Sequence, residues 1–138
     1  MNNQLIETAK ILIQDHPTQL SVYANIASLI YGALPELNWV GFYLNDGNRL
    51  ILGPFMGKPA TTEIPFERGV CGECVRKKET VYVPDVHVHP DHIACDAASE
   101  SELVIPMLSK GKLIGVLDID SPKKNRFDQE TITSLEKI

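Results

Sequence analysis

The alternation of side chains between residues 38 and 45 is the feature that most constrains the fold of this chain. In an extended strand one face would carry Val40, Phe42 and Leu44, and the other Trp39, Gly41 and Tyr43. Asp46-Gly47 follows directly, and Asp-Gly commonly forms the tight turn of a hairpin. The residues from Arg49 to Phe55 are then expected to form the second strand. The segment therefore predicts a β-hairpin and, with it, an antiparallel sheet.

Two helices are expected ahead of this hairpin. Apolar residues recur at helical spacing between residues 5 and 13. Thr18 is the expected N-cap of a second helix that reaches about Tyr31 and stops at Gly32.

The remainder of the chain predicts a short helix, three strands and a final helix. The short helix is expected from Gly69 to Lys78, and a strand over residues 81–83. Two further strands, over 102–108 and 113–120, are joined by a tight turn, and Asp128 is the expected N-cap of the last helix. Helices and antiparallel strands in this order predict an α+β fold.

Composition limits the classes of protein to which the chain can belong. Its 138 residues predict one domain over 1–138. No C-cap signal closes the last helix before Ile138, so a truncated last helix remains an alternative. The net charge of -5 argues against nucleic-acid binding. No apolar stretch approaches the roughly 20 residues of a membrane span. Residues 1–4 do not resemble a secretion signal, so we expect a cytoplasmic protein with reduced thiols.

Three acidic residues near the last two strands are candidates for a binding site. Asp118 and Asp120 lie two residues apart and so share a face, with Cα atoms about 6.6 Å apart. Glu102 joins them only if the connecting turn has an odd number of residues. Clustered carboxylates need a cation such as an ammonium group, or a shared proton. An amino-acid site and a set of solvated strand-end acids both fit this pattern.

The aromatic face of the first strand suggests a small pocket. Gly41 would leave a gap between Trp39 and Tyr43, and aromatic walls suit a soft or cationic ligand. The alternative is that both are ordinary half-buried strand aromatics.

The first two cysteines lie on the predicted short helix. Cys71 falls in its first turn, where free backbone N–H groups and the nearby Arg68 would favour a thiolate. Cys74 completes a Cys-x-x-Cys spacing, which fits a redox pair, half of a zinc site or a small buried residue.

The third cysteine lies in a predicted loop rich in histidine. His87, His89, His92 and Cys95 could in principle hold a tetrahedral metal ion. The loop context instead favours an accessible, reactive Cys95 whose thiolate His92 helps to stabilise, and no metal is expected.

Several segments together resemble one known family. They are Asn38–Tyr43, Gly69–Gly72, Asp85–His87, His92–Ser99 and Gly115–Ser121. The chain resembles the free methionine-(R)-sulfoxide reductases, which belong to the GAF-domain family. The resemblance implies a GAF-like α+β fold, with a six-stranded antiparallel sheet, helices packed mainly on one face, and a small closed pocket for one free amino acid.

The resemblance also implies an activity and the residues that perform it. The reaction is the reduction of free L-methionine-(R)-S-oxide to L-methionine, with no bound cofactor and with reducing equivalents from thioredoxin. By position, Cys95 matches the catalytic cysteine and Cys71 the partner that forms a disulfide with it. The matches to the substrate pocket are Trp39, Tyr43, Glu102, Asp118 and Asp120.

One position departs from the family pattern. Many members carry a third cysteine ten residues before the one that Cys71 matches, and Thr61 stands at that position here. Cys74 is then a candidate auxiliary thiol.

Two further alternatives remain. The protein could form a homodimer, and its function could be that of a non-catalytic GAF sensor of a small molecule.

Overall fold

An antiparallel sheet divides the protein into two layers of unequal thickness. The computed structural model describes residues 3–14, 18–89 and 98–138. The strands are β1 (Trp39–Asn45), β2 (Leu50–Gly57), β3 (Glu63–Ile64), β4 (Val81–Val83), β5 (Ser101–Ser109) and β6 (Lys112–Ser121). Their order across the sheet is β3-β2-β1-β6-β5-β4, and every neighbouring pair is antiparallel. The predicted six-stranded antiparallel sheet is confirmed.

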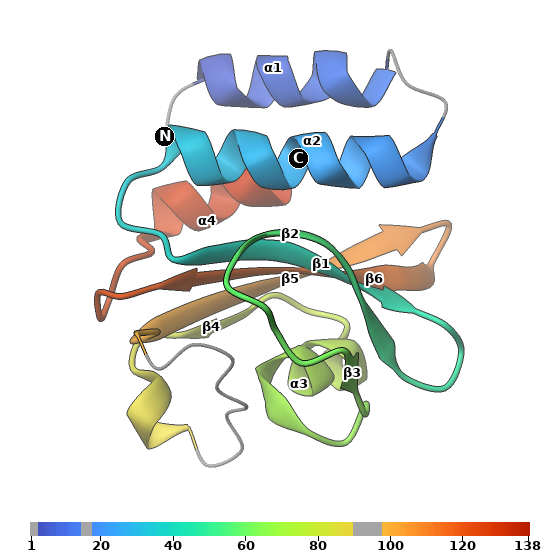
Figure 1. The fold of residues 1–138 in the computed structure, drawn as a ribbon, viewed down its shortest axis with the longest axis vertical. Helices are drawn as coiled ribbons and strands as arrows, with labels where there is room; N and C mark the ends of the chain where they lie inside the picture. The colour runs from blue at the N-terminus through green and yellow to red at the C-terminus, as the bar shows by residue number, and fades with distance from the viewer. Residues whose placement is uncertain (1–2, 15–17, 90–97) are drawn as a thin grey trace.

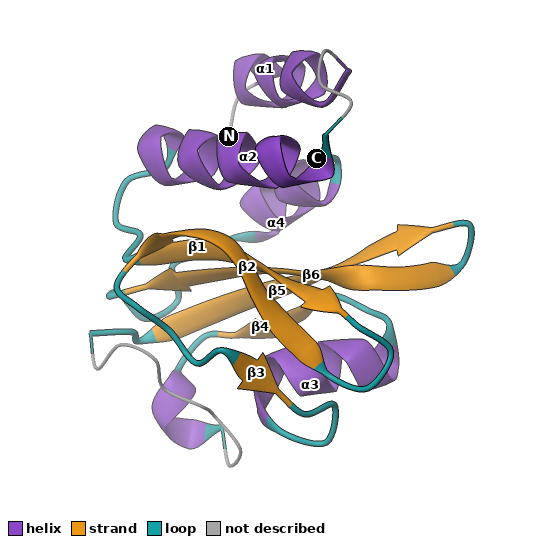
Figure 2. Ribbon diagram, turned by 45° about the vertical axis from the view of Figure 1, so that its right-hand side comes forward, coloured by secondary structure: helices purple, strands orange, loops and turns teal. Residues whose placement is uncertain are grey.

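The helices are distributed unequally between the two faces. They are α1 (Asn3–Gln14), α2 (Gln19–Ala33), α3 (Gly69–Lys77) and α4 (Gln129–Glu136). Figure 1 shows α2 and α4 against one face, with α1 outside α2, while α3 lies on the opposite face beside β3. The side view in Figure 2 shows the same separation. Helices packed mainly on one face, as predicted, leave the other face to α3 and the loops around it.

The alternation in β1 serves two separate cores. Val40 and Phe42 belong to the core beneath α2 and α4. Trp39 and Tyr43 belong to a second core beneath α3. Both faces of this strand are therefore buried, which explains why its two sets of alternating residues are both largely apolar.

The second helix ends for a different reason than the sequence suggested. The helix passes through Gly32 and ends at Ala33, so the predicted stop at Gly32 was wrong. Leu34 adopts an extended conformation because Pro35 follows it, and a residue before proline is restricted away from helical angles. Thr18 occupies the N-cap position as predicted, but its side chain makes no capping hydrogen bond.

At the last helix the predicted cap is confirmed. The Asp128 carboxylate accepts a hydrogen bond from the backbone N–H of Thr131 at 2.8 Å. The two-residue strand β3 was not predicted, because it is too short to show any alternation.

A β-bulge decides which way Glu102 points. The turn between β5 and β6 contains only Lys110-Gly111, and this even number would by itself pair Glu102 with Ile119. Ile114 is an extra residue on β6 that shifts the register by one. Glu102 therefore pairs with Asp120, so the third carboxylate does join the other two.

Candidate active site

The three carboxylates lie side by side on the face of the sheet that α3 covers. Asp120 is paired with Glu102 on β5 and with Trp39 on β1. Asp118, two residues earlier, is paired with Gly41 on β1. All three acidic side chains are about 95% buried, so they are not the solvated strand-end acids of the alternative interpretation.

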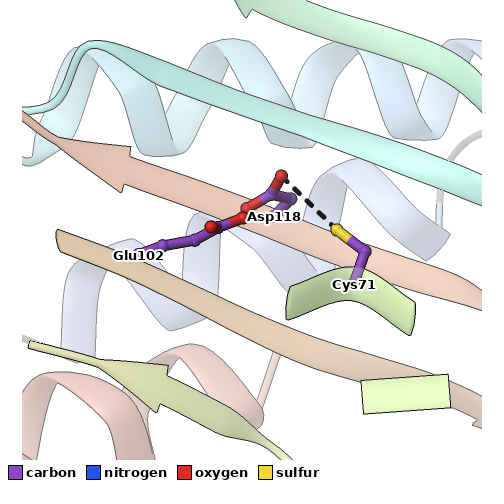
Figure 3. Close-up of side chains that lie close together, drawn as sticks. All are labelled: Cys71, Glu102 and Asp118. Atoms are coloured by element: carbon purple, nitrogen blue, oxygen red, sulfur yellow. Dashed lines mark hydrogen bonds between the residues drawn. The ribbon is translucent and has the colours of Figure 1, made fainter. Parts of the chain in front are cut away.

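Helix α3 brings the Cys71 thiol to these carboxylates. Cys71 lies in the first turn of the helix, and its Sγ donates a hydrogen bond to Asp118 Oδ2 at 3.5 Å. Figure 3 shows the thiol directed at Asp118, with Glu102 beside it. The close packing of this helix requires Gly72, because a Cβ there would lie 2.8 Å from the carbonyl oxygen of Phe66.

The thiol and the carboxylates enclose a small cavity. Its volume is about 20 Å³, which is enough for roughly one water molecule. Its described walls are Tyr43, Ile64, Gly69, Val70, Cys71, Glu102, Asp118 and Asp120. No sequence pattern indicated Ile64, which lies in the unpredicted β3, whereas Gly69 and Val70 could have been inferred from their position beside Cys71.

The predicted Cys71 thiolate was wrong. Burial is the main cause that raises the pKa of this thiol well above its ordinary value, and ionisation of the neighbouring carboxyl groups of Asp118, Glu102 and Asp120 raises it further. The pKa is raised although the thiol lies in the first turn of a helix, where the dipole favours a thiolate. Cys71 is therefore a protonated thiol near neutral pH.

The surroundings of Asp118 also favour its protonated form. Burial raises the pKa of its carboxyl well above the ordinary value, and the neighbouring charge of Glu102 raises it further. Its Oδ1 is buried, and the described residues supply no hydrogen bond of normal geometry to it. A neutral acid beside a thiol is an arrangement that can transfer a proton.

The predicted gap above Gly41 does not exist. A Cβ on Gly41 would lie 2.5 Å from Trp39 Cη2 and 2.4 Å from the Cβ of Phe55, so the indole ring already fills this space. Trp39 stacks on Tyr43 and on Phe55, with ring centroids 5.9 Å and 5.3 Å apart. Tyr43 lines the cavity, as expected for a pocket residue.

The polar hydrogens of both aromatic side chains already donate to backbone carbonyl groups. Trp39 Nε1 donates to the Lys58 carbonyl at 3.0 Å, and the Tyr43 hydroxyl donates to the Thr61 carbonyl at 2.9 Å. The backbone carbonyl of Thr61 thus supports one wall of the pocket.

Cys74 is not among the described residues that line this cavity. Its side chain is fully buried, and its Sγ donates to the carbonyl of Val104 at 3.8 Å. Burial, followed by the charges of Asp118 and Glu73, raises the pKa of Cys74 to about 12. Among the three interpretations of the Cys-x-x-Cys spacing, this geometry favours a small buried residue.

Two of the loop histidines can be placed. His87 Nε2 contacts Glu100 Oε2, and His89 Nε2 lies 2.9 Å from Glu73 Oε1. His92 and Cys95 lie outside the described residues.

In the cavity beneath α3, the ligand atoms of Cys71, Glu102 and Asp118 lie within 4.8 Å of one another, which would also suit a metal ion. Metal ions bind thiolates, so the raised pKa of Cys71 favours an acid–thiol site over a metal site.

Comparison with known proteins places this arrangement in a family. The sequence matches the GAF domain family over residues 23–138. The free methionine-R-sulfoxide reductase of Escherichia coli (strain K12) is 48% identical over 119 residues, which are 86% of this chain and 72% of that protein. This chain belongs to the GAF-domain family of free methionine-R-sulfoxide reductases.

Solved structures of family members share the whole fold. The fRMsr of Staphylococcus aureus, in complex with substrate, is 46% identical, with a TM-score of 0.92 over 97% of this chain and 88% of that chain. The free methionine-R-sulfoxide reductase of Neisseria meningitidis, in complex with its substrate, is 42% identical, with a TM-score of 0.94 over 98% and 81%. The predicted GAF fold is thereby confirmed. In the part of the chain that the structure describes, no helix has the length and apolar character that crossing a bilayer requires.

Proposed function

We propose that this protein is an oxidoreductase that reduces free L-methionine-(R)-S-oxide to L-methionine. The observation that carries the proposal is the buried contact between the Cys71 thiol and the Asp118 carboxyl, beside Glu102 and Asp120. Thiol and acid are the two groups that sulfoxide reduction needs. Relatives in the same family have been crystallised with their substrate, which supports the assignment.

In the first proposed step the Cys95 thiolate attacks the sulfur of the sulfoxide. The sulfur–oxygen bond breaks, the oxygen passes to Cys95 as a sulfenic acid, and methionine leaves. The sulfoxide oxygen must gain a proton during this transfer. Asp118 is the best placed donor, because it lines the cavity and its raised pKa favours the protonated form. Trp39 and Tyr43 are less suited, since their polar hydrogens are bonded to backbone carbonyls.

In the second step Cys71 resolves the sulfenic acid. Its sulfur attacks the sulfur of Cys95, a disulfide forms, and hydroxide leaves and is protonated to water. Asp118, now a carboxylate 3.5 Å away, accepts the proton of the Cys71 thiol and returns to its acid form. A high thiol pKa thus has a use: Cys71 does not compete with Cys95 as the first nucleophile, and it is activated only after Asp118 has given up its proton.

Glu102 and Asp120 are proposed to bind the substrate ammonium group, while Trp39 and Tyr43 form the aromatic wall. Opposite charge would relieve the repulsion between two clustered carboxylates. Since methionine sulfoxide is much larger than a water molecule, the cavity walls must move when substrate binds.

Thioredoxin is the proposed reductant of the resulting disulfide, and the cytoplasm the proposed compartment. Thiol–disulfide exchange requires an accessible sulfur. Cys74 is fully buried and Cys71 is only 3% exposed, so we propose that thioredoxin attacks the Cys71–Cys95 disulfide directly, at the Cys95 sulfur, without Cys74 as an auxiliary thiol.

The proposal is tested by NADPH consumption with thioredoxin and thioredoxin reductase. Free methionine-(R)-sulfoxide, free methionine-(S)-sulfoxide and a blocked peptide-like sulfoxide are offered to the wild type, to Cys95→Ser and to Cys74→Ser. We expect turnover of the free R epimer alone, lost in Cys95→Ser and retained in Cys74→Ser. Binding of the free sulfoxide without turnover in the wild type would contradict the enzyme and support a GAF sensor.

A further inference from the structure

We infer that Ser99, held by Asn38, is a positioning residue for the Asp120 carboxylate. The inference rests on the proposed function, because it concerns the same site. Ser99 and Asn38 both lie beside the cavity without lining it.

The two residues connect Asp120 to the start of β1 by three hydrogen bonds. The Asn38 side-chain amide donates to Ser99 Oγ at 3.0 Å, and Ser99 Oγ donates to Asp120 Oδ2 at 3.5 Å. The backbone N–H of Asn38 also donates to the backbone carbonyl of Asp120 at 3.0 Å. Asn38 therefore contacts Asp120 directly through its backbone and indirectly through the Ser99 hydroxyl. At 3.5 Å the bond to the carboxylate is long, and such bonds in active sites often shorten when substrate binds.

The hydrogen bond between Ser99 and Asp120 is shielded from water. Ser99 is only 4% exposed and Asp120 only 6%, so water does not readily replace either partner. The backbone beside Ser99 is fixed as well, because the N–H of Glu100 donates to the carbonyl of Ser121 at 2.7 Å. A hydroxyl held in this way has a defined position from which to donate.

Acidic groups stand beside Asp120 in the site. Glu102 lies directly opposite on β5, and Asp118 lies two residues away on the same face. Repulsion among these groups favours rotation of the Asp120 side chain away from the site. A hydrogen bond from Ser99 to Asp120 Oδ2 opposes this rotation and keeps the carboxylate directed at the cavity.

The chain offers a matched control two residues away. Ser101 is fully buried on β5, and its Oγ donates to the carbonyl of Lys123 at 2.7 Å instead of to a carboxylate. It neighbours Glu102 in sequence and therefore faces the other side of the sheet. Replacing either serine by alanine removes one buried hydroxyl, but only Ser99→Ala removes a donor to Asp120.

The first test compares steady-state kinetics of Ser99→Ala, Ser101→Ala and Ser99→Thr in the full chain. We expect kcat/KM for free methionine-(R)-sulfoxide to fall roughly tenfold in Ser99→Ala, as for the loss of one hydrogen bond to a charged group. Ser99→Thr keeps the hydroxyl and should recover most of the rate, and Ser101→Ala should stay within about twofold of the wild type. Adding Asn38→Ala to Ser99→Ala should cost little more, because both act through one bond.

The second test does not depend on turnover. In ¹³C NMR of the side-chain carboxyl groups, Ser99→Ala should shift the Asp120 signal, whereas Ser101→Ala should not. If the wild type reduces no sulfoxide, the proposed function fails, and this spectrum still decides the inference. The inference is overturned if Ser99→Ala and Ser101→Ala leave the Asp120 signal equally unchanged, or lower kcat/KM equally in an active enzyme.

Discussion

The Cys71 thiol and the Asp118 carboxyl share one physical constraint, which is that both are buried among acidic groups. Burial and the nearby negative charges raise both pKa values. A group whose folded pKa is raised favours folding while it is protonated, and that contribution is lost as the pH rises toward the folded pKa. For Asp118 the loss begins near pH 4, and for Cys71 only above about pH 9. Between pH 5 and 8, therefore, Asp118 is expected to dominate.

We predict that Asp118→Asn weakens the pH dependence of stability. The free energy of unfolding of the wild type should fall from pH 5 toward pH 8 relative to Asp118→Asn, by at most about 1.4 kcal/mol per pH unit. Urea titrations at several pH values measure this difference. Asp46→Asn is the control, because hydrogen bonds from backbone N–H groups lower the Asp46 pKa and its contribution changes only in acid. Parallel stability curves for the wild type and Asp118→Asn would contradict a raised Asp118 pKa.

The two helical cysteines should differ sharply in their effect on catalysis. Cys71→Ser should abolish continued turnover with thioredoxin but still release about one methionine per chain, because Cys95 can form a sulfenic acid once. Cys74→Ser should keep most of the wild-type rate, since that sulfur is fully buried, contacts the Val104 carbonyl and is not part of the described cavity lining. Product analysis under single-turnover and steady-state conditions distinguishes them. Loss of turnover in Cys74→Ser, with stability retained, would show that the auxiliary thiol takes part.

At the scale of elements, the β-bulge at Ile114 determines the composition of the site. The alternation of residues predicted strands β5 and β6 and placed Asp118 and Asp120 on one face. The same reasoning could not place Glu102, because a bulge depends on the pairing of two strands and leaves no periodic signal in either. Turn length alone would have assigned Glu102 to the wrong face.

Deletion of Ile114 should therefore remove Glu102 from the site. The register would slip by one residue and direct a carboxylate into the core beneath α2, at a cost of about 3 kcal/mol or more. Urea denaturation and calorimetric binding of free methionine-(R)-sulfoxide measure both consequences. Ile114→Ala keeps the extra residue, so it should retain binding. Equal binding by the deletion variant would show that the bulge does not set the position of Glu102.

The N-caps of two helices offer a test of local stability. Asp128→Ala should lower the free energy of unfolding by about 1 kcal/mol, because it removes the hydrogen bond to the N–H of Thr131. Thr18→Ala should cost clearly less, since the Thr18 side chain makes no capping hydrogen bond. Urea midpoints of the two variants provide the comparison, and equal losses would contradict the observed difference in capping.

At the scale of the whole molecule, the site lies between the sheet and α3, on the face that fewer helices cover. Sequence patterns predicted the hairpin, the α3 segment and the antiparallel sheet, since each depends on local periodicity and turn chemistry. They did not predict that Trp39 fills the space above Gly41, or that Cys71 is a protonated thiol. Both properties arise from packing between segments far apart in the chain, and no local pattern records such contacts.

The most direct measurement of the central claim is a single reaction without any reductant. Reduced protein is mixed with an excess of free methionine-(R)-sulfoxide, and methionine, remaining thiols and disulfide-linked peptides are quantified by mass spectrometry. We predict about one methionine per chain, the loss of two thiols and a disulfide between Cys71 and Cys95. Unchanged thiols and no methionine, from protein that is folded and fully reduced, would contradict it.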